Sequence, residues 1–313
     1  MNKREVLQRY LSGESAGGYV PAAFFTHFGE DYKSGQAAID RHKQFFEFTG
    51  MDFVKIQFEL PFPRKEIATC SDYVHLPCLP LEYYRPQLDV VKGLVNALKS
   101  DALVILTLYS PFMIAGQMVG NDTLIEHLEL DPEPVFKGME AVTDSLIEFV
   151  RECKRLGLDG FYHSTQGGES HRFKDREIFA KWVQPSDMRL MKEIDFSFPF
   201  NILHICDYHS EYRGYDDLTQ FHDYPGTVVN VSTHIGAKTL TTAELSAVFE
   251  RPFMGGLDRL GPLSSGSESD ARTAAMHVLA HAPSRFILGA DCTVPGNTPW
   301  VNLRAAIETA HQH

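Results

Sequence analysis

The chain has 313 residues, and its 43% hydrophobic and 22% charged residues are typical of a globular protein. A net charge of -12 argues against a nucleic-acid-binding surface, and no apolar run approaches the roughly 18 residues of a membrane-spanning helix. Five cysteines behind an amino terminus without an export signal favour reduced thiols. We therefore expect a soluble, cytoplasmic protein with no nucleic-acid or membrane partner.

Apolar, β-branched and aromatic runs alternate with helical segments along the chain. The expected strands cover residues 19–25, 52–58, 103–109, 160–164, 200–206, 227–232, 253–257 and 286–290. The expected helices cover residues 34–49, 87–99, 133–156, 187–195, 242–249, 268–282 and 298–311. Eight alternating units without a repeat or linker predict an α/β fold, a (β/α)8 TIM barrel forming a single domain over residues 1–313.

Local signals mark two helix ends and one long insertion. Thr298-Pro299 predicts an N-cap followed by proline at the first helical position, and Gly157 after a basic helix end predicts a C-terminal cap. Residues 60–84 form a Pro-rich insertion after the second strand. Because long loops in compact domains are often functional lids, we expect this insertion to act as one.

Polar residues at the strand ends define the expected site, because TIM barrels carry their chemistry at the carboxyl ends of the strands. The expected substrate-binding residues are Gln57, Tyr109, His163, Gln166 and Asn230. Two aspartates, Asp258 and Asp291, are candidate catalytic residues that orient ligands or hold substrate. Aspartates at strand ends also serve as turn or cap residues, so that alternative stays open.

The most specific chemical signal is the pair His204 and Cys206. Residues i and i+2 of a strand point the same way, so both side chains can reach one point. Cys292 follows the last expected strand and completes the set only if its loop leans in, because the fifth and eighth strands are not neighbours. One imidazole and two thiolates suit zinc, and three ligands leave a position for water or substrate. Buried structural cysteines and the competing set His204, Cys206 and His209 are the alternatives.

Several short motifs are spread over the whole chain. They are Asn2-Lys3-Arg4-Glu5-Val6-Leu7 with Gly13-Glu14 and Val20-Pro21, then Gly256-Leu257-Asp258, and finally Phe286-Ile287-Leu288-Gly289-Ala290-Asp291-Cys292-Thr293-Val294-Pro295 with Thr298-Pro299 and Asn302. Together they resemble the uroporphyrinogen decarboxylase superfamily. The resemblance implies a TIM barrel and one of two chemistries. These are cofactor-free decarboxylation of a tetrapyrrole, and zinc-dependent methyl transfer from a corrinoid protein to a thiol such as coenzyme M.

The methyltransferase branch of that superfamily carries an H-x-C motif followed by a distant cysteine. His204, Cys206 and Cys292 match it position for position. The match implies Zn²⁺ held by these residues, with a methylcobamide on a partner corrinoid protein as methyl donor and a small thiol as acceptor. In that branch the motif is often followed by glycine, whereas this chain has Asp207, which leaves the thiol substrate open.

The decarboxylase branch differs from this chain at the amino terminus. Its signature there contains arginines that hold the substrate's carboxylates, and residues 20–28 contain none. The sequence therefore favours a zinc-dependent corrinoid:thiol methyltransferase. The alternatives are a uroporphyrinogen decarboxylase-type carboxy-lyase and a non-catalytic corrinoid- or tetrapyrrole-binding protein. The oligomeric state stays open, a homodimer included.

Overall fold

Seven parallel strands form the central sheet. The computed structural model describes residues 2–14, 18–208 and 210–313. The sheet has the order β1-β2-β3-β4-β5-β8-β9, so each strand lies beside its successor in this set. The strands are β1 (Phe53–Ile56), β2 (Leu103–Tyr109), β3 (Gly160–Thr165), β4 (Ile202–Ile205), β5 (Val228–Val231), β8 (Phe253–Leu257) and β9 (Ile287–Ala290). The predicted α/β class is confirmed.

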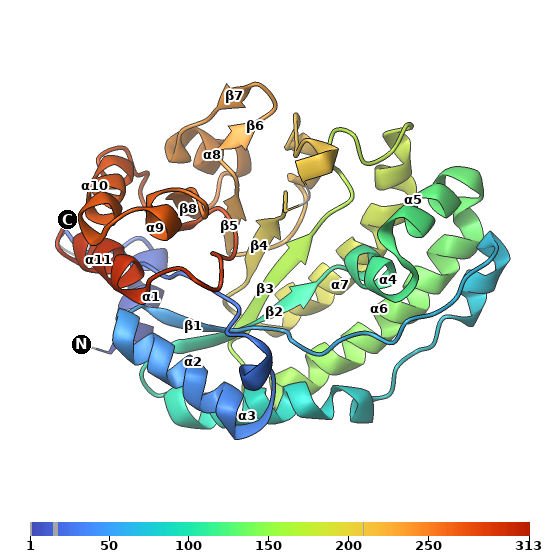
Figure 1. The fold of residues 1–313 in the computed structure, drawn as a ribbon, viewed down its shortest axis with the longest axis horizontal. Coiled ribbons are helices and arrows are strands. Elements are labelled where there is room, and N and C mark those ends of the chain that lie inside the picture. Colours follow the sequence, from blue (N-terminus) through green and yellow to red (C-terminus); the bar gives the residue numbers. More distant parts are fainter. Residues whose placement is uncertain (1, 15–17, 209) are drawn as a thin grey trace.

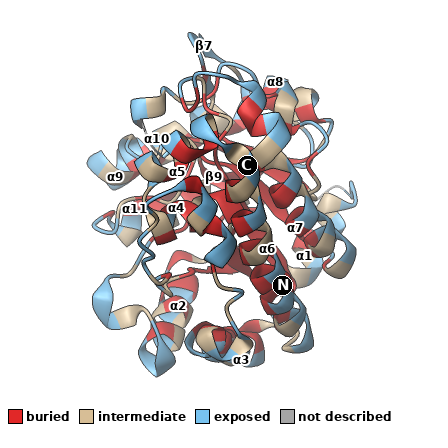
Figure 2. Cartoon of the chain, turned by 90° about the vertical axis from the view of Figure 1, so that its right-hand side faces the viewer, coloured by how far each residue is buried: buried red, intermediate tan, exposed pale blue. Residues whose placement is uncertain are grey.

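Helices cover the outside of the curled sheet (Figure 1), and buried residues concentrate where helices and sheet meet (Figure 2). The helices are α1 (Lys3–Leu11), α2 (Gly35–Thr49), α3 (Arg85–Leu98), α4 (Pro111–Val119), α5 (Asn121–Leu130), α6 (Pro132–Arg155), α7 (Gln184–Ser197), α8 (Thr242–Phe249), α9 (Pro262–Ser265), α10 (Glu268–Leu279) and α11 (Trp300–His311). A small hairpin, β6 (His234–Ile235) with β7 (Lys238–Thr239), stands apart from the sheet. Within the described residues, no helix is both long and apolar enough to cross a membrane.

Burial on both faces explains why the strand sequences lack a simple alternation. In β2, Leu103 to Leu108 are all buried, as expected for a parallel strand covered by helices on one side and core on the other. Helix α6 instead buries a stripe that includes Val135, Met139, Val142 and Leu146, with the spacing of three or four residues of an amphipathic helix. The buried residues of β2 and α6 belong to one hydrophobic core.

The first expected strand, residues 19–25, is not a regular strand. The segment makes isolated bridges only, from Ala22 to Leu288 and from Thr26 to Val294. Pro21 has no amide hydrogen, and the amide of Ala22 donates to the carboxylate of Asp52 at 2.7 Å instead of to a strand carbonyl. Side-chain bonding thus replaces part of the ladder. Seven of the eight predicted strands are confirmed, and the remaining one, the first in the chain, is an irregular segment beside β9.

Of the two predicted helix ends, one was wrong and one was right. Helix α11 begins at Trp300 with Pro299 as its N-cap, because the hydroxyl of Thr298 bonds Ser264 at 2.9 Å instead of capping the helix. Gly157 does follow α6, with a φ of 87° that suits glycine.

The insertion at residues 60–84 packs against a helix instead of covering the site. Its short helix at Cys70–His75 lies on α6, and the carbonyl of Tyr73 approaches so closely that a Cβ at Gly138 would sit 2.6 Å from it. Within the described residues, this insertion contributes nothing to the lining of the central cavity described below. The structure therefore does not support the predicted lid.

Candidate metal and substrate site

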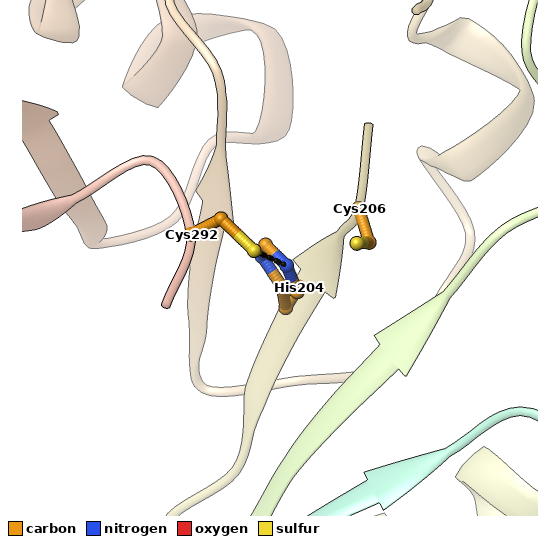
Figure 3. A group of neighbouring side chains, drawn as sticks. All are labelled: His204, Cys206 and Cys292. Carbon is orange, nitrogen blue, oxygen red and sulfur yellow. Dashed lines mark hydrogen bonds between the residues drawn. The ribbon is translucent and has the colours of Figure 1, made fainter. Parts of the chain in front are cut away.

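Three ligand-type side chains from the ends of two strands converge at the carboxyl edge of the sheet (Figure 3). His204 lies on β4, Cys206 directly follows that strand, and Cys292 lies two residues beyond β9. Their ligand atoms all lie within 4.8 Å of one another, and the Cys292 sulfur is 3.4 Å from His204 Nε2. Strands β5 and β8 separate β4 from β9, so Cys292 reaches the cluster from its loop, as the sequence required. The competing ligand His209 lies outside the described residues.

The cluster is buried, and its two thiols share a hydrogen bond. His204, Cys206 and Cys292 are at most 8% exposed. The bond with the Cys292 thiol lowers the pKa of Cys206 well below its usual value, and the same bond, together with burial, raises the pKa of Cys292. The two thiols therefore titrate as a coupled pair, in which Cys292 holds its proton more tightly than Cys206 does.

A stacked tyrosine, itself hydrogen-bonded to an asparagine, holds the His204 imidazole in place. The ring of Tyr162 stacks on that of His204 with 4.8 Å between centroids, and its hydroxyl donates to Asn230 Oδ1 at 2.6 Å. Asn230 Nδ2 donates in turn to the carbonyls of Met254 at 2.9 Å and Ala290 at 3.0 Å. Asn230 is thus fully occupied within the core and does not line the cavity, contrary to its predicted role in substrate binding.

A cavity of about 390 Å³ opens directly over the cluster. This volume suits a small molecule, since pockets for drug-sized ligands span roughly 300–1,000 Å³. The lining residues are His27, Lys55, Gln57, Thr107, Tyr109, Met113, Gln117, Tyr162, Ser164, Gln166, His204, Cys206, Tyr208, Arg259, Leu260, Cys292, Thr293, Val294, Pro295 and Gly296. The predicted residues Gln57, Tyr109 and Gln166 are among them.

A buried lysine forms part of the cavity wall on β1. Lys55 is 4% exposed, donates to Gln57 Oε1 at 2.9 Å, and lies over the rings of Phe25 at 4.6 Å and Tyr162 at 4.7 Å. Thr107 donates to the same Gln57 oxygen at 3.2 Å. Burial lowers the pKa of Lys55 to about 7. Sequence reasoning missed this lysine, although its two-residue spacing from Gln57 places both on one face of the strand.

The two candidate catalytic aspartates lie close to Arg259, an arginine of the cavity wall, and Asp291 binds it directly. Asp291 accepts hydrogen bonds from the Arg259 backbone at 2.7 Å and from its guanidinium at 3.0 Å, and Asp207 lies 3.6 Å from the same group. Burial raises the pKa of Asp291. Asp258 is exposed and accepts from the amide of Leu260 at 2.8 Å, which is a turn role. Neither predicted catalytic aspartate lines the cavity; Arg259 does.

His163 faces the helices and not the cavity. Its Nε2 is 2.5 Å from Asp187 of α7, and Thr165 donates to the other oxygen of that carboxylate at 2.5 Å. The cavity receives Tyr162, Ser164 and Gln166 from the same segment. Because strand residues alternate between faces, odd and even positions of β3 cannot share this cavity. The structure thus assigns His163 to the packing of β3 on α7.

Helix α4 supplies two lining residues that the sequence analysis did not anticipate. Met113 and Gln117 extend from this helix into the cavity wall. The helix begins where Ser110 accepts from the amide of Met113 at 3.3 Å, with Pro111 in the first turn. Ser-Pro directly after a strand is a helix-start signal, so α4 was open to prediction.

The fold and this cluster together define a parallel α/β protein with a ligand-type His-Cys-Cys site at the strand ends. The model of the family described as uroporphyrinogen decarboxylase (URO-D) matches residues 45–313. The chain belongs to this family, which confirms the resemblance read from its motifs.

Individual proteins are similar to this chain in sequence or in fold. A curated methylated-thiol--coenzyme M methyltransferase of Methanosarcina mazei is 24% identical over 230 residues, which cover 72% of this chain but only 59% of that protein. Among solved structures, a methyltransferase from Methanosarcina mazei superposes with a TM-score of 0.76 at 13% identity, covering 99% of this chain and 98% of that one. A B12-independent methionine synthase from Shewanella sp. W3-18-1, in complex with selenomethionine, gives 0.59 at 11% identity, covering 93% and 97%. The structural matches establish the fold alone.

Proposed function

We propose that this protein is a zinc-dependent methyltransferase that transfers a methyl group from a corrinoid on a partner protein to a small thiol. One observation carries the proposal: His204, Cys206 and Cys292, up to 88 residues apart in sequence, meet within 4.8 Å beside a cavity. The relative named as a methylated-thiol--coenzyme M methyltransferase supports the reaction class. We further place the site at the mouth of one (β/α)8 barrel domain whose eighth position is filled by residues 21–26.

The donor set fits a zinc ion. Imidazole nitrogen and thiolate sulfur are preferred zinc ligands, and three protein ligands leave a position for substrate. His204 Nδ1 is buried without a hydrogen-bond partner among the described residues, while Nε2 faces the Cys292 sulfur, so no polar group outside the cluster competes for the imidazole nitrogens. A bound zinc ion would supply Lewis acidity that stabilises the acceptor's sulfur as a thiolate.

The chain's own residues orient the acceptor and keep water from it. Tyr162 holds the His204 ring by stacking, while Tyr109 and Met113 give the cavity an apolar wall. On the β1 side, Lys55 Nζ donates to Gln57 Oε1 and Gln57 Nε2 donates to the carbonyl of Thr26, and the remaining N–H hydrogens of both groups would bind the polar part of a bound molecule. Desolvation by these walls strengthens every polar contact made inside the cavity.

The decarboxylase alternative is disfavoured by the cavity itself. A substrate with eight carboxylates needs several bidentate cationic partners. Among the described residues, Lys55 and Arg259 are the lysine and arginine that line the cavity, and Arg259 already pairs with Asp291. A macrocycle-binding protein without turnover is a further alternative, which predicts cobalamin binding without zinc or methyl transfer.

Metal analysis combined with a transfer assay tests the proposal. The purified chain is expected to carry about one zinc, and to convert methylcobalamin to its demethylated form when a small thiol is added. Cys206→Ser and Cys292→Ser should lose both properties, whereas Cys78→Ser, an exposed cysteine away from the cluster, should retain them. A wild-type chain without zinc that also fails to bind added zinc refutes the proposal.

A further inference from the structure

The amide of Gln166 makes a directional contact with the metal cluster. Its Nε2 donates to the Cys206 sulfur at 3.4 Å, and its Oε1 accepts from Arg172 Nη2 at 3.4 Å. A guanidinium only donates hydrogen bonds, so it selects the oxygen end of the amide. The NH₂ group is then left facing the sulfur. The reverse orientation would oppose two sets of donors at Arg172 and place an oxygen lone pair against Cys206.

Arg172 is itself held in a single orientation. Its Nε donates to Glu169 Oε2 at 3.0 Å, and its Nη2 bonds the other oxygen of that carboxylate. Glu169 also accepts from the backbone amide of Gly167 at 2.7 Å, and the guanidinium lies 3.6 Å from the centroid of the Tyr212 ring. Both charged side chains are at most 1% exposed. The loop after β3 therefore closes on itself and fixes the direction of the guanidinium.

Stability alone does not account for a buried ion pair at this position. The cost of removing two charges from water offsets most of their attraction, so a well-packed apolar pair serves stability equally well. An apolar pair could not orient an amide. Two contacts distinguish this pair from an apolar one. The bond from the Gly167 amide to Glu169 stays within the loop, whereas the bond from Arg172 to Gln166 continues to Cys206.

We propose that Glu169 and Arg172 are positioning residues that hold Gln166 with its amide hydrogen directed at the Cys206 sulfur. The inference rests on the proposed function, in which that sulfur is a metal ligand. A hydrogen bond to a ligating thiolate draws electron density from the sulfur, and it disfavours rotation of the side chain away from the metal. Groups behind metal ligands typically change metal affinity by roughly 10- to 100-fold when mutated.

Cobalt(II) provides the readout, because its thiolate charge-transfer absorption reports the electron density on sulfur and needs no turnover. The full chain is loaded with Co²⁺, and its affinity is measured by competition with a chelator. Gln166→Leu should shift the charge-transfer band to lower energy and weaken Co²⁺ binding about 10-fold. Arg172→Met should shift the band and the affinity in the same direction. Combining Gln166→Leu with Arg172→Met should weaken Co²⁺ binding no further than Gln166→Leu alone, because both substitutions remove the same hydrogen bond to Cys206.

Two further variants control for folding and charge. Arg172→Met leaves Glu169 buried without its partner, so Glu169→Gln with Arg172→Met, which removes both charges, is measured beside it. Arg176→Met removes a nearby exposed arginine that pairs with Asp216 and should leave the spectrum and affinity unchanged. Wild-type values in Gln166→Leu, or in the charge-free double variant, overturn the inference while the proposed metal site stands. A wild-type chain that binds no Co²⁺ removes the proposed function and this inference together.

Discussion

The two walls of the cavity are built from different chemistry and are unequally visible in the sequence. One wall, at the ends of β4 and β9, carries His204, Cys206 and Cys292. The second wall, formed by β1 and the residue that follows it, carries Lys55 and Gln57. The first wall contains residue types whose spacing has a known meaning, whereas the second is a lysine within an apolar strand. The comparison teaches that metal ligands can be predicted from a sequence motif. Polar residues of the cavity wall can be predicted only by working out which face of its strand each residue occupies.

The largest expected difference between the two walls concerns metal retention. Structural zinc sites contribute roughly 10–16 kcal/mol over four ligands, so loss of one ligand costs about 3 kcal/mol, or more than 100-fold in affinity. His204→Ala should show this loss in a zinc-chelator competition. Gln57→Leu, on the second wall, should bind zinc as the wild type does. Equal zinc affinities of His204→Ala and Gln57→Leu would contradict the assignment of zinc binding to the wall that carries His204.

The ligand wall should also respond to pH. The hydrogen bond between the thiols lowers the pKa of Cys206 and raises that of Cys292, so zinc must displace the proton held by Cys292. Below the raised pKa, zinc affinity should therefore increase about 10-fold per pH unit, which is about 1.4 kcal/mol. Competition titrations at several pH values, with proton release followed by an indicator dye, measure this slope. A pH-independent affinity across the neutral range would show that both thiols are already ionised.

The lysine wall should respond to pH in folding stability. The pKa of Lys55 is lowered to about 7 in the folded protein, while an unfolded lysine keeps a pKa near 10.4. The unfolded chain binds more protons between these values, so this lysine makes stability rise with pH over that range. Lys55→Met should remove the slope and raise the free energy of unfolding at pH 6 by ~1–2 kcal/mol, while slowing methyl transfer. Denaturant unfolding at pH 6 and pH 9 measures it; an unchanged slope would mean that Lys55 is not desolvated.

The smallest effect is expected outside both walls. Asp258 is exposed and accepts one hydrogen bond from Leu260, and asparagine can make the same bond. Asp258→Asn should change stability by less than about 0.5 kcal/mol and leave methyl transfer unaltered. Thermal unfolding and the transfer assay check this. A large loss of activity with intact stability would restore Asp258 as a catalytic residue.

The sequence could predict most of the sheet and the ligand-type cluster, for identifiable physical reasons. Parallel strands covered on both sides are continuous apolar runs, and these are recognisable without knowing their partners. The segment at residues 19–25 looked the same, but its pairing is partly replaced by the carboxylate of Asp52, which no local pattern reveals. Helix α4 was missed although Ser110-Pro111 marks its start.

The individual site residues show where reasoning by strand ends fails. Grouping every polar residue at the end of β3 put His163 and Gln166 together, yet their odd spacing puts them on opposite faces. Asn230 does face inward, but its amide is consumed by core carbonyls, which depends on contacts between distant strands. Alternation along the strand could have corrected the first error. Only the three-dimensional packing could correct the second.

The position of Cys292 in a loop far from β4 has a consequence for the integrity of the fold. An ion bound jointly by Cys206 and Cys292 would act as a cross-link that encloses β5, β8 and β9 within one covalently and coordinatively closed loop. Such a closure restricts the unfolded chain, and long loops gain most from it in the chain-entropy description. Loading with zinc should therefore slow proteolysis of the carboxyl-terminal third more than that of the segment before β4.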